Sequence, residues 1–161
     1  MKQSIKLDIP EDLMLQAAVG RVAIRHGQLD HVLRMMVKTF RGITIMVAMK
    51  ETKRWGSLRL RELIEELAAE KLGKTEAAAL KELKRLLKKA EDLTEKRNRI
   101  IHDVWARTKG GIPVIRDDNS EIRIQPTAAV LDRLANEIAE VAYDLNEGRL
   151  RGFLSEALSR L

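Results

Sequence analysis

The sequence predicts an all-α protein, an antiparallel helical bundle with one small β-hairpin inserted after the third long helix. The first reason is composition, because Ala, Leu, Glu, Lys and Arg are abundant while the chain has only 9 Gly and 3 Pro. The second is that apolar residues recur every three or four positions through long stretches. The third is that the stretch at about 106–126 breaks this period. A chain of 161 residues is the size of one domain, so we expect a single unit over residues 1–161.

The first half of the chain predicts two long helices with a short one between them. The Pro and acids of "DIPED" open the first long helix, which we expect to reach about Phe40 and to end at Arg41-Gly42. The short apolar stretch "ITIMVAMKET" fits either a helix or a buried strand, and its helical neighbours favour a helix. In the following helix, Ser57 is the expected N-cap and Gly73 the expected stop.

The second half predicts a third long helix, a hairpin and two further helices. The third long helix should be capped by Thr75, and its buried stripe should contain Leu86, Ala90, Leu93, Ile100 and Val104. A Gly-Gly pair, Pro113 and the polar cluster 117–120 then separate short alternating apolar runs. These runs predict a β-hairpin, with a third strand near Val104–Thr108. A capped helix follows Pro126, and a short helix ends the chain.

Composition narrows the function classes. The chain has no Cys and only three His, without the spacing of a zinc site, and the Asp117–Asn119 run lacks the ligand spacing of a calcium loop. No apolar stretch approaches the roughly 20 residues that cross a bilayer, and the first residues lack the apolar core of a signal peptide. We therefore expect a cytoplasmic protein that does not contact membranes. The formal net charge of +6 is compatible with a polyanionic partner such as nucleic acid.

The third long helix carries an arginine where an apolar residue is expected. On a helical wheel Arg97 falls within the buried stripe, with Asn98 beside it and His102 five positions on, about 140° away. A guanidinium is costly to bury unless it is paired, so Arg97 has two interpretations. It pairs with an acid in the core, for instance from the first helix, or it belongs to a site that handles phosphate. One regular helix points Arg97 and His102 apart, so they converge only if Arg97 reaches along the groove, if the helix unwinds near His102, or if a second copy of the helix faces the first across a two-fold axis; we expect such a homodimer.

The segment "RNRIIH", from Arg97 to His102, resembles the Arg-x(4–6)-His motif of the HEPN superfamily (higher eukaryotes and prokaryotes nucleotide-binding). Members of this family commonly have a polar residue, often Asn, directly after the arginine, and Asn98 fits. Their motif lies towards the end of a late helix in an all-α bundle, which is where the sequence places it here. The resemblance therefore implies a HEPN-like helical domain.

The resemblance also implies a function. Many HEPN proteins are metal-independent endoribonucleases that need no cofactor and act as toxins, phage-defence effectors or RNA-processing factors. They place two motifs in a shared cleft, which here implies a homodimer with RNA as substrate. Transferred to this sequence, the catalytic residues would be Arg97, Asn98 and His102. His102 would be the general base or acid, Arg97 would hold the scissile phosphate, and Asn98 would orient His102 or contact the phosphate.

Alternatives remain open at this point. Some HEPN toxins carry a Tyr two residues after the His, which a paired antitoxin modifies, whereas this chain has Val104 there. Modification of that kind is not expected, although a nucleotidyltransferase antitoxin remains an implied partner. Other family members are non-catalytic modules that dimerise or bind a nucleotide or protein, and a plain bundle with a structural Arg97 is a third interpretation. The Lys-rich stretch 80–97 is either a solvated helix face or a guide for an RNA backbone.

Overall fold

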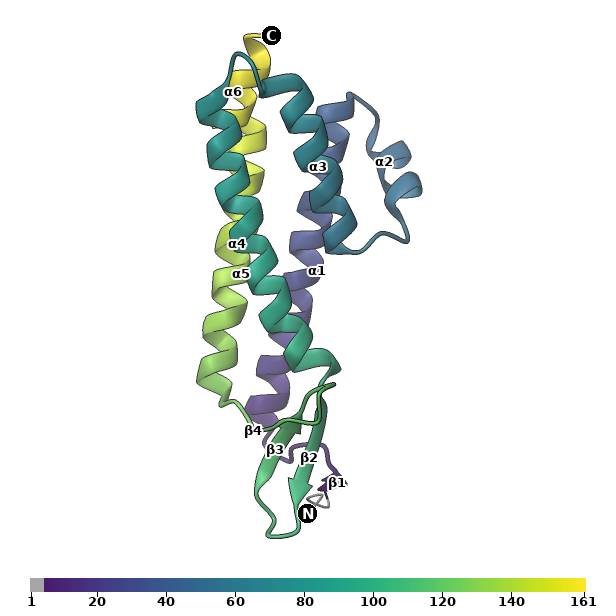
Figure 1. The fold of residues 1–161 in the computed structure, drawn as a ribbon, viewed down its shortest axis with the longest axis vertical. Helices are drawn as coiled ribbons and strands as arrows, with labels where there is room; N and C mark the ends of the chain where they lie inside the picture. Colours follow the sequence, from purple (N-terminus) through teal and green to yellow (C-terminus); the bar gives the residue numbers. More distant parts are fainter. Residues whose placement is uncertain (1–4) are drawn as a thin grey trace.

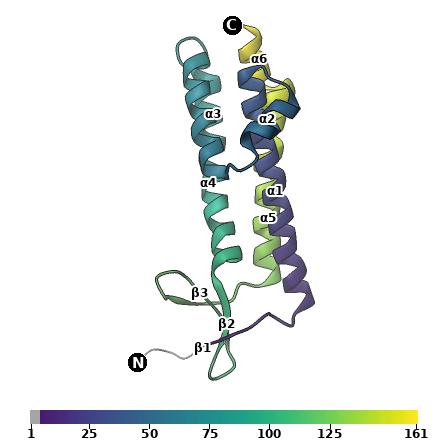
Figure 2. The same ribbon diagram turned by 90° about the vertical axis from the view of Figure 1, so that its right-hand side faces the viewer.

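The computed structural model describes residues 5–161 (Figure 1). Its elements follow in the order β1 (Ile5–Leu7), α1 (Leu13–Arg41), α2 (Ile45–Thr52), α3 (Ser57–Leu72), α4 (Ala77–His102), β2 (Val104–Thr108), β3 (Pro113–Arg116), β4 (Ile122–Ile124), α5 (Ala128–Arg151) and α6 (Phe153–Ser159). The described chain is mostly helical, as predicted, with a small antiparallel sheet at one end of the bundle (Figures 1 and 2). No helix within residues 5–161 has both the length and the apolar content needed to cross a bilayer.

The direction of the helices differs in part from the expected antiparallel arrangement. Helix α4 runs antiparallel to α1, α3 and α5, but α1 and α5 pack along each other and both run away from the sheet (Figures 1 and 2). The reason lies in the connections. Helix α4 ends at the end of the bundle where α1 begins, and the sheet keeps the chain there, so α5 starts beside α1 and runs in the same direction (Figure 1).

The first helix has the caps that its sequence indicates. The side chain of Asp12 accepts hydrogen bonds from the backbone N–H groups of Met14 and Leu15 at 2.9 and 3.2 Å. At the other end Gly42 adopts φ 65°, a left-handed conformation that costs glycine little, and its N–H reaches the carbonyls of the last turn. The helix therefore ends at Arg41, one residue from the predicted position. The stretch that favoured a short helix forms α2, also as predicted.

Two predicted N-caps are wrong. Gly56 occupies the cap position of α3, and Ser57 is the first helical residue, because its hydroxyl is engaged with Asp30 of α1 instead of with its own helix. Glu76, rather than Thr75, precedes α4, and neither helix has a side-chain cap at its start. The carboxylate of Glu76 is bound by the guanidinium of Arg160 at 2.7 and 2.8 Å. In both cases a tertiary partner competes with the local capping interaction.

The sheet is larger than the predicted hairpin. Strands β2, β3 and β4 match the expected three-stranded unit, and the turn between β3 and β4 is closed by the Asp117 side chain, which accepts from the N–H groups of Asn119 and Glu121. The sequence did not predict β1, which pairs antiparallel with β2 so that Leu7 lies opposite Ala106. Val104 belongs to β2 and not to the helical stripe, because α4 ends two residues earlier.

The hydrophobic core lies between the long helices and is aliphatic. The predicted stripe of α4 is buried at Leu86, Ala90, Leu93 and Ile100. It packs against one face each of α1, α3 and α5, with Phe40 as the largest fully buried side chain. This core holds the C-terminal half of α4 in place and so positions the segment from Arg97 to His102.

Candidate functional site

The candidate site lies at the end of α4, where the chain leaves the helix for β2. Helix α4 stops at His102 because Asp103 has extended backbone angles, φ −67° and ψ 152°. The indole Nε1–H of Trp105 donates to the carbonyl of Ile100 at 2.8 Å and so satisfies one of the carbonyls left free at a helix end. Since Trp105 packs against the core, this bond fixes the turn from which His102 projects.

The structure brings together all three residues of the predicted motif within one chain. Arg97 donates from Nη1 to the side-chain oxygen of Asn98 at 2.9 Å, and the same Nη1 lies 3.4 Å from Nε2 of His102. A guanidinium only donates, so a hydrogen bond at this contact uses a lone pair on Nε2, as in the tautomer that carries its proton on Nδ1. Of the routes by which Arg97 and His102 could meet, the reach of the Arg97 side chain within one chain is therefore the one observed, and a second copy of the helix is not needed. The long Arg97 side chain spans the gap around the helix.

Arg97 lies at the edge of the core and has no acidic partner there. Its side chain is half-buried, and Nε is buried without a hydrogen-bond partner among the described residues. None of the ion pairs found in residues 5–161 includes Arg97. The core ion pair with an acid of the first helix is thus not formed. The positive charge remains available beside two exposed polar side chains, Asn98 and His102.

A buried polar cluster lies one turn before Arg97, where α1, α3 and α4 meet. His26 of α1 lies 3.2 Å from the Thr94 hydroxyl through Nε2 and 3.5 Å from Asp30 through Nδ1. The Ser57 hydroxyl donates to Asp30 at 2.5 Å, and the Thr94 hydroxyl donates to the carbonyl of Ala90 at 2.7 Å. Since polar groups are buried at little cost only when they are paired, this cluster fixes how the three helices meet.

The cluster is electrostatically linked to Arg97. Burial lowers the pKa of His26 below its ordinary value of 6.5, the negative charge of Asp30 opposes this, and the positive charges of Arg97 and Arg61 lower the pKa further. His26 is therefore neutral at pH 7. In the sequence, His26 counts only as one of the three His that lack the spacing of a zinc site, and Asp30 was not predicted to belong to a polar cluster. Their spacing of four positions, on the apolar face of a predicted helix, was the signal that could have identified the cluster.

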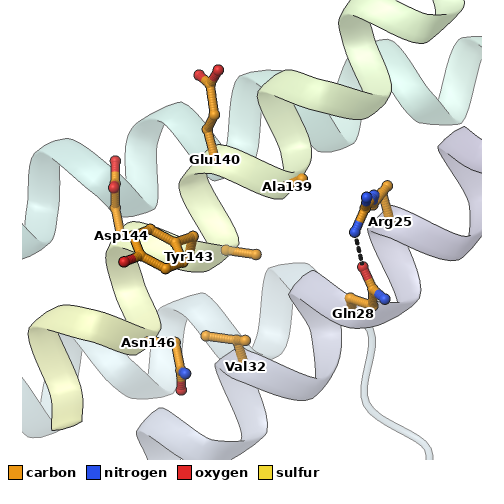
Figure 3. Close-up of a pocket in the computed structure, with 9 residues that line it drawn as sticks. Arg25, Gln28, Val32, Ala139, Glu140, Tyr143, Asp144 and Asn146 are labelled. Carbon is orange, nitrogen blue, oxygen red and sulfur yellow. Dashed lines mark hydrogen bonds between the residues drawn. The ribbon is translucent and has the colours of Figure 1, made fainter.

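Another groove lies elsewhere on the surface. It lies between α1 and α5 and is lined by Arg25, Gln28, Tyr143 and Asp144 among others (Figure 3). Arg25 donates to the side-chain oxygen of Gln28 at 3.0 Å, so one N–H donor of its guanidinium is already used within the same helix. Arg25 and Gln28 lie on the α5 side of α1, whereas His26 points to α3 and α4. This groove therefore does not connect with Arg97 or His102.

Comparison with known proteins identifies no similar protein. The chain matches no family model, no curated protein and no solved structure. Within residues 5–161 no group of three or more His, Asp or Glu side chains is arranged to hold a metal ion. What can be said about function therefore comes from the motif and its geometry.

Proposed function

We propose that this protein is a metal-independent endoribonuclease of the HEPN type, with His102, Arg97 and Asn98 as its catalytic residues. The observation that carries the proposal is the contact of Arg97 with His102 at the exposed end of α4, with no carboxylate paired to the guanidinium. A fixed positive charge beside an imidazole provides what RNA transesterification needs, a phosphate ligand and a group that exchanges protons near neutral pH.

The proposed reaction uses the 2′-hydroxyl of the RNA as nucleophile. When the scissile phosphate binds, its oxygens take the Nη1 donor of Arg97 from His102, which frees the Nε2 lone pair. His102 then removes the proton from the 2′-hydroxyl, and the 2′-oxygen forms a bond to phosphorus as the bond to the 5′-oxygen breaks. Arg97 stabilises the charge that develops on the phosphate oxygens. The products carry a 2′,3′-cyclic phosphate and a 5′-hydroxyl.

Asn98 would orient Arg97 and contact the phosphate. Its side-chain oxygen accepts from Arg97, so its NH₂ group is directed elsewhere and remains a donor for a phosphate oxygen. Its carbonyl restrains the guanidinium on the side of the helix where His102 lies. Asn98 therefore orients Arg97 more directly than it orients His102.

A homodimer is part of the proposal. One chain already joins Arg97 to His102, so a second copy is not needed to bring these two residues together. What supports a dimer is the chemistry, because the leaving 5′-oxygen needs a proton and the motif contains a single imidazole. A two-fold interface that faces two motifs would supply that proton from His102 of the partner subunit. A role as a toxin or phage-defence effector, with a nucleotidyltransferase antitoxin as partner, is supported by the family resemblance alone.

The test is cleavage of single-stranded RNA by the purified protein in EDTA. We expect products with 2′,3′-cyclic phosphate and 5′-hydroxyl ends, and no cleavage of RNA methylated at the 2′-oxygen. His102→Ala should abolish cleavage, whereas His31→Ala, at an exposed position on α1, should leave it unchanged. Cleavage that persists in His102→Ala would show that the roles are wrong. Binding of RNA without cleavage in the wild-type protein would instead favour the non-catalytic HEPN-like module.

A further inference from the structure

A second surface of α4 carries positive charge next to the proposed catalytic residues. On the flank that faces α5, Lys96 and Arg99 of α4 and Arg133 of α5 line a groove whose other wall is the sheet. The ion pairs found in residues 5–161 include none of these three cations. A single acidic side chain, Glu137, lines the groove with them. Three cations thus face one hollow without a bound acid, which favours an anionic occupant.

The groove ends near the turn that carries His102. Lys96 and Arg99 line it at a spacing of three positions on α4, and His102 follows Arg99 at the same spacing, so the three form a row that winds around the helix, with neighbouring Cβ atoms roughly 5–6 Å apart. At the sheet end of this row, Arg123 lines the groove and binds the Asp103 carboxylate at 2.9 Å. Asp103 follows His102 in the chain. The wall of the groove is therefore tied to the turn that presents the catalytic imidazole.

The floor of the groove is apolar and open to solvent. Ile124 at the edge strand is 83% exposed and Val130 in the first turn of α5 is 49% exposed, while Ile115 beneath them is buried. Exposed aliphatic side chains framed by cations fit a ligand that is charged along its backbone and apolar on its faces. An unpaired nucleotide has this form, whereas a duplex encloses its base faces and presents mainly phosphates and sugars.

We propose that this groove binds the single-stranded RNA next to the scissile phosphate, with the backbone on Lys96, Arg99 and Arg133 and an unpaired base against Ile124 and Val130. The inference rests on the proposed ribonuclease function, because it takes the row of cations as leading to a phosphate at His102. It defines the substrate as RNA that is unpaired beside the cleavage point.

The binding test uses protein that cannot cleave. In a His102→Ala background, a fluorescently labelled oligoribonucleotide and its duplex are titrated with full-length protein at several salt concentrations. The triple variant Lys96→Gln, Arg99→Gln, Arg133→Gln should bind the single strand more weakly. Its plot of log affinity against log salt should become shallower by about 2, since each lost single-strand phosphate contact removes about 0.7. Ile124→Ser should weaken single-strand binding several-fold with the salt slope unchanged.

The control keeps the same net charge. Lys74→Gln, Lys81→Gln, Lys84→Gln removes three exposed cations around the other end of α4, and its binding should match that of the parent. Equal effects of the two triple variants, or preference for the duplex, would overturn the groove proposal. The groove substitutions are also made in protein that retains His102. If they leave RNA cleavage unchanged, the groove proposal is wrong and the ribonuclease proposal stands. If the wild-type protein never cleaves RNA but binds it through the groove, the groove proposal is supported and the ribonuclease proposal is refuted.

Discussion

Replacement of Arg97 by Ala separates a structural arginine from a catalytic one. In a core ion pair, removal of the arginine leaves a buried carboxylate and costs roughly 3–5 kcal/mol of unfolding free energy. In this structure Arg97 leaves no carboxylate behind, because no ion pair among residues 5–161 involves it and Asp30 is bound by Ser57. The substitution should therefore lower activity much more than stability.

The expected stability change follows from two opposing contributions. The variant loses a hydrogen bond to the exposed Asn98, worth about 0.5–1.5 kcal/mol, together with some packing of the arginine stem. It also removes a buried Nε that lacks a partner, which relieves a cost of about 1–3 kcal/mol. The net change should stay within about 1 kcal/mol, which for a chain of this size corresponds to a melting temperature within roughly 4 °C of the wild type.

The assay is thermal unfolding followed by circular dichroism, with RNA cleavage measured on the same samples. Asp30→Ala is the matched control, since it deprives the buried Ser57 hydroxyl of its acceptor and removes the carboxylate that faces His26. It should cost roughly 1–3 kcal/mol. A fall in melting temperature of roughly 10 °C or more in Arg97→Ala, as large as an ion pair would give, would refute the reasoning and make Arg97 a structural residue.

Two further predictions concern the bundle. Because the pKa of His26 is lowered on folding, the unfolded chain binds more protons, so stability should be complete above about pH 6.5 and fall as the pH drops below it. Urea unfolding between pH 5 and 8 measures this dependence, and an unchanged slope in His26→Gln would contradict it. Gly148→Ala should destabilise by roughly 1–3 kcal/mol, because the added Cβ would lie 2.3 Å from Cε1 of Phe153. The control is Gly20→Ala in α1, where an added Cβ meets nothing within 4 Å, and it should stabilise the protein by up to about 1 kcal/mol. Thermal unfolding of both variants measures the difference. Equal shifts in melting temperature would show that the contact with Phe153 does not cause the destabilisation.

The local sequence pattern was sufficient to predict the long helices and the position of the Arg97–His102 motif. The three- and four-residue period of α1 and α4, the cap at Asp12 and the stop at Gly42 are interactions between near neighbours, so the sequence alone determined them. The same holds for the turn at Asp117, whose side chain bonds to its own loop. Residues 97, 98 and 102 could therefore be placed near the end of a late helix without any tertiary information.

Contacts between distant segments required the tertiary structure. Strand β1 exists because it pairs with β2, about a hundred residues along the chain, and three residues have no periodicity that would indicate a strand. Ser57 departs from the local capping rule because its hydroxyl donates to Asp30 of α1, and Glu76, which takes the cap position predicted for Thr75, is bound by the distant Arg160. The shared direction of α1 and α5 likewise depends on α4 ending beside the start of α1 and on the sheet keeping the chain at that end.

The candidate site combines both kinds of information. The sequence identified Arg97, Asn98 and His102, but it left open whether the reach of Arg97, an unwound helix end or a second copy of the helix joins Arg97 to His102. The structure shows that a single arginine side chain spans that distance, and helix wheels contain only backbone directions and not the reach of a long side chain. The cluster of His26, Asp30, Ser57 and Thr94 behind it comes from three helices. Its formation was decided by packing, because a buried polar group can be satisfied only by whichever partners the fold brings within reach.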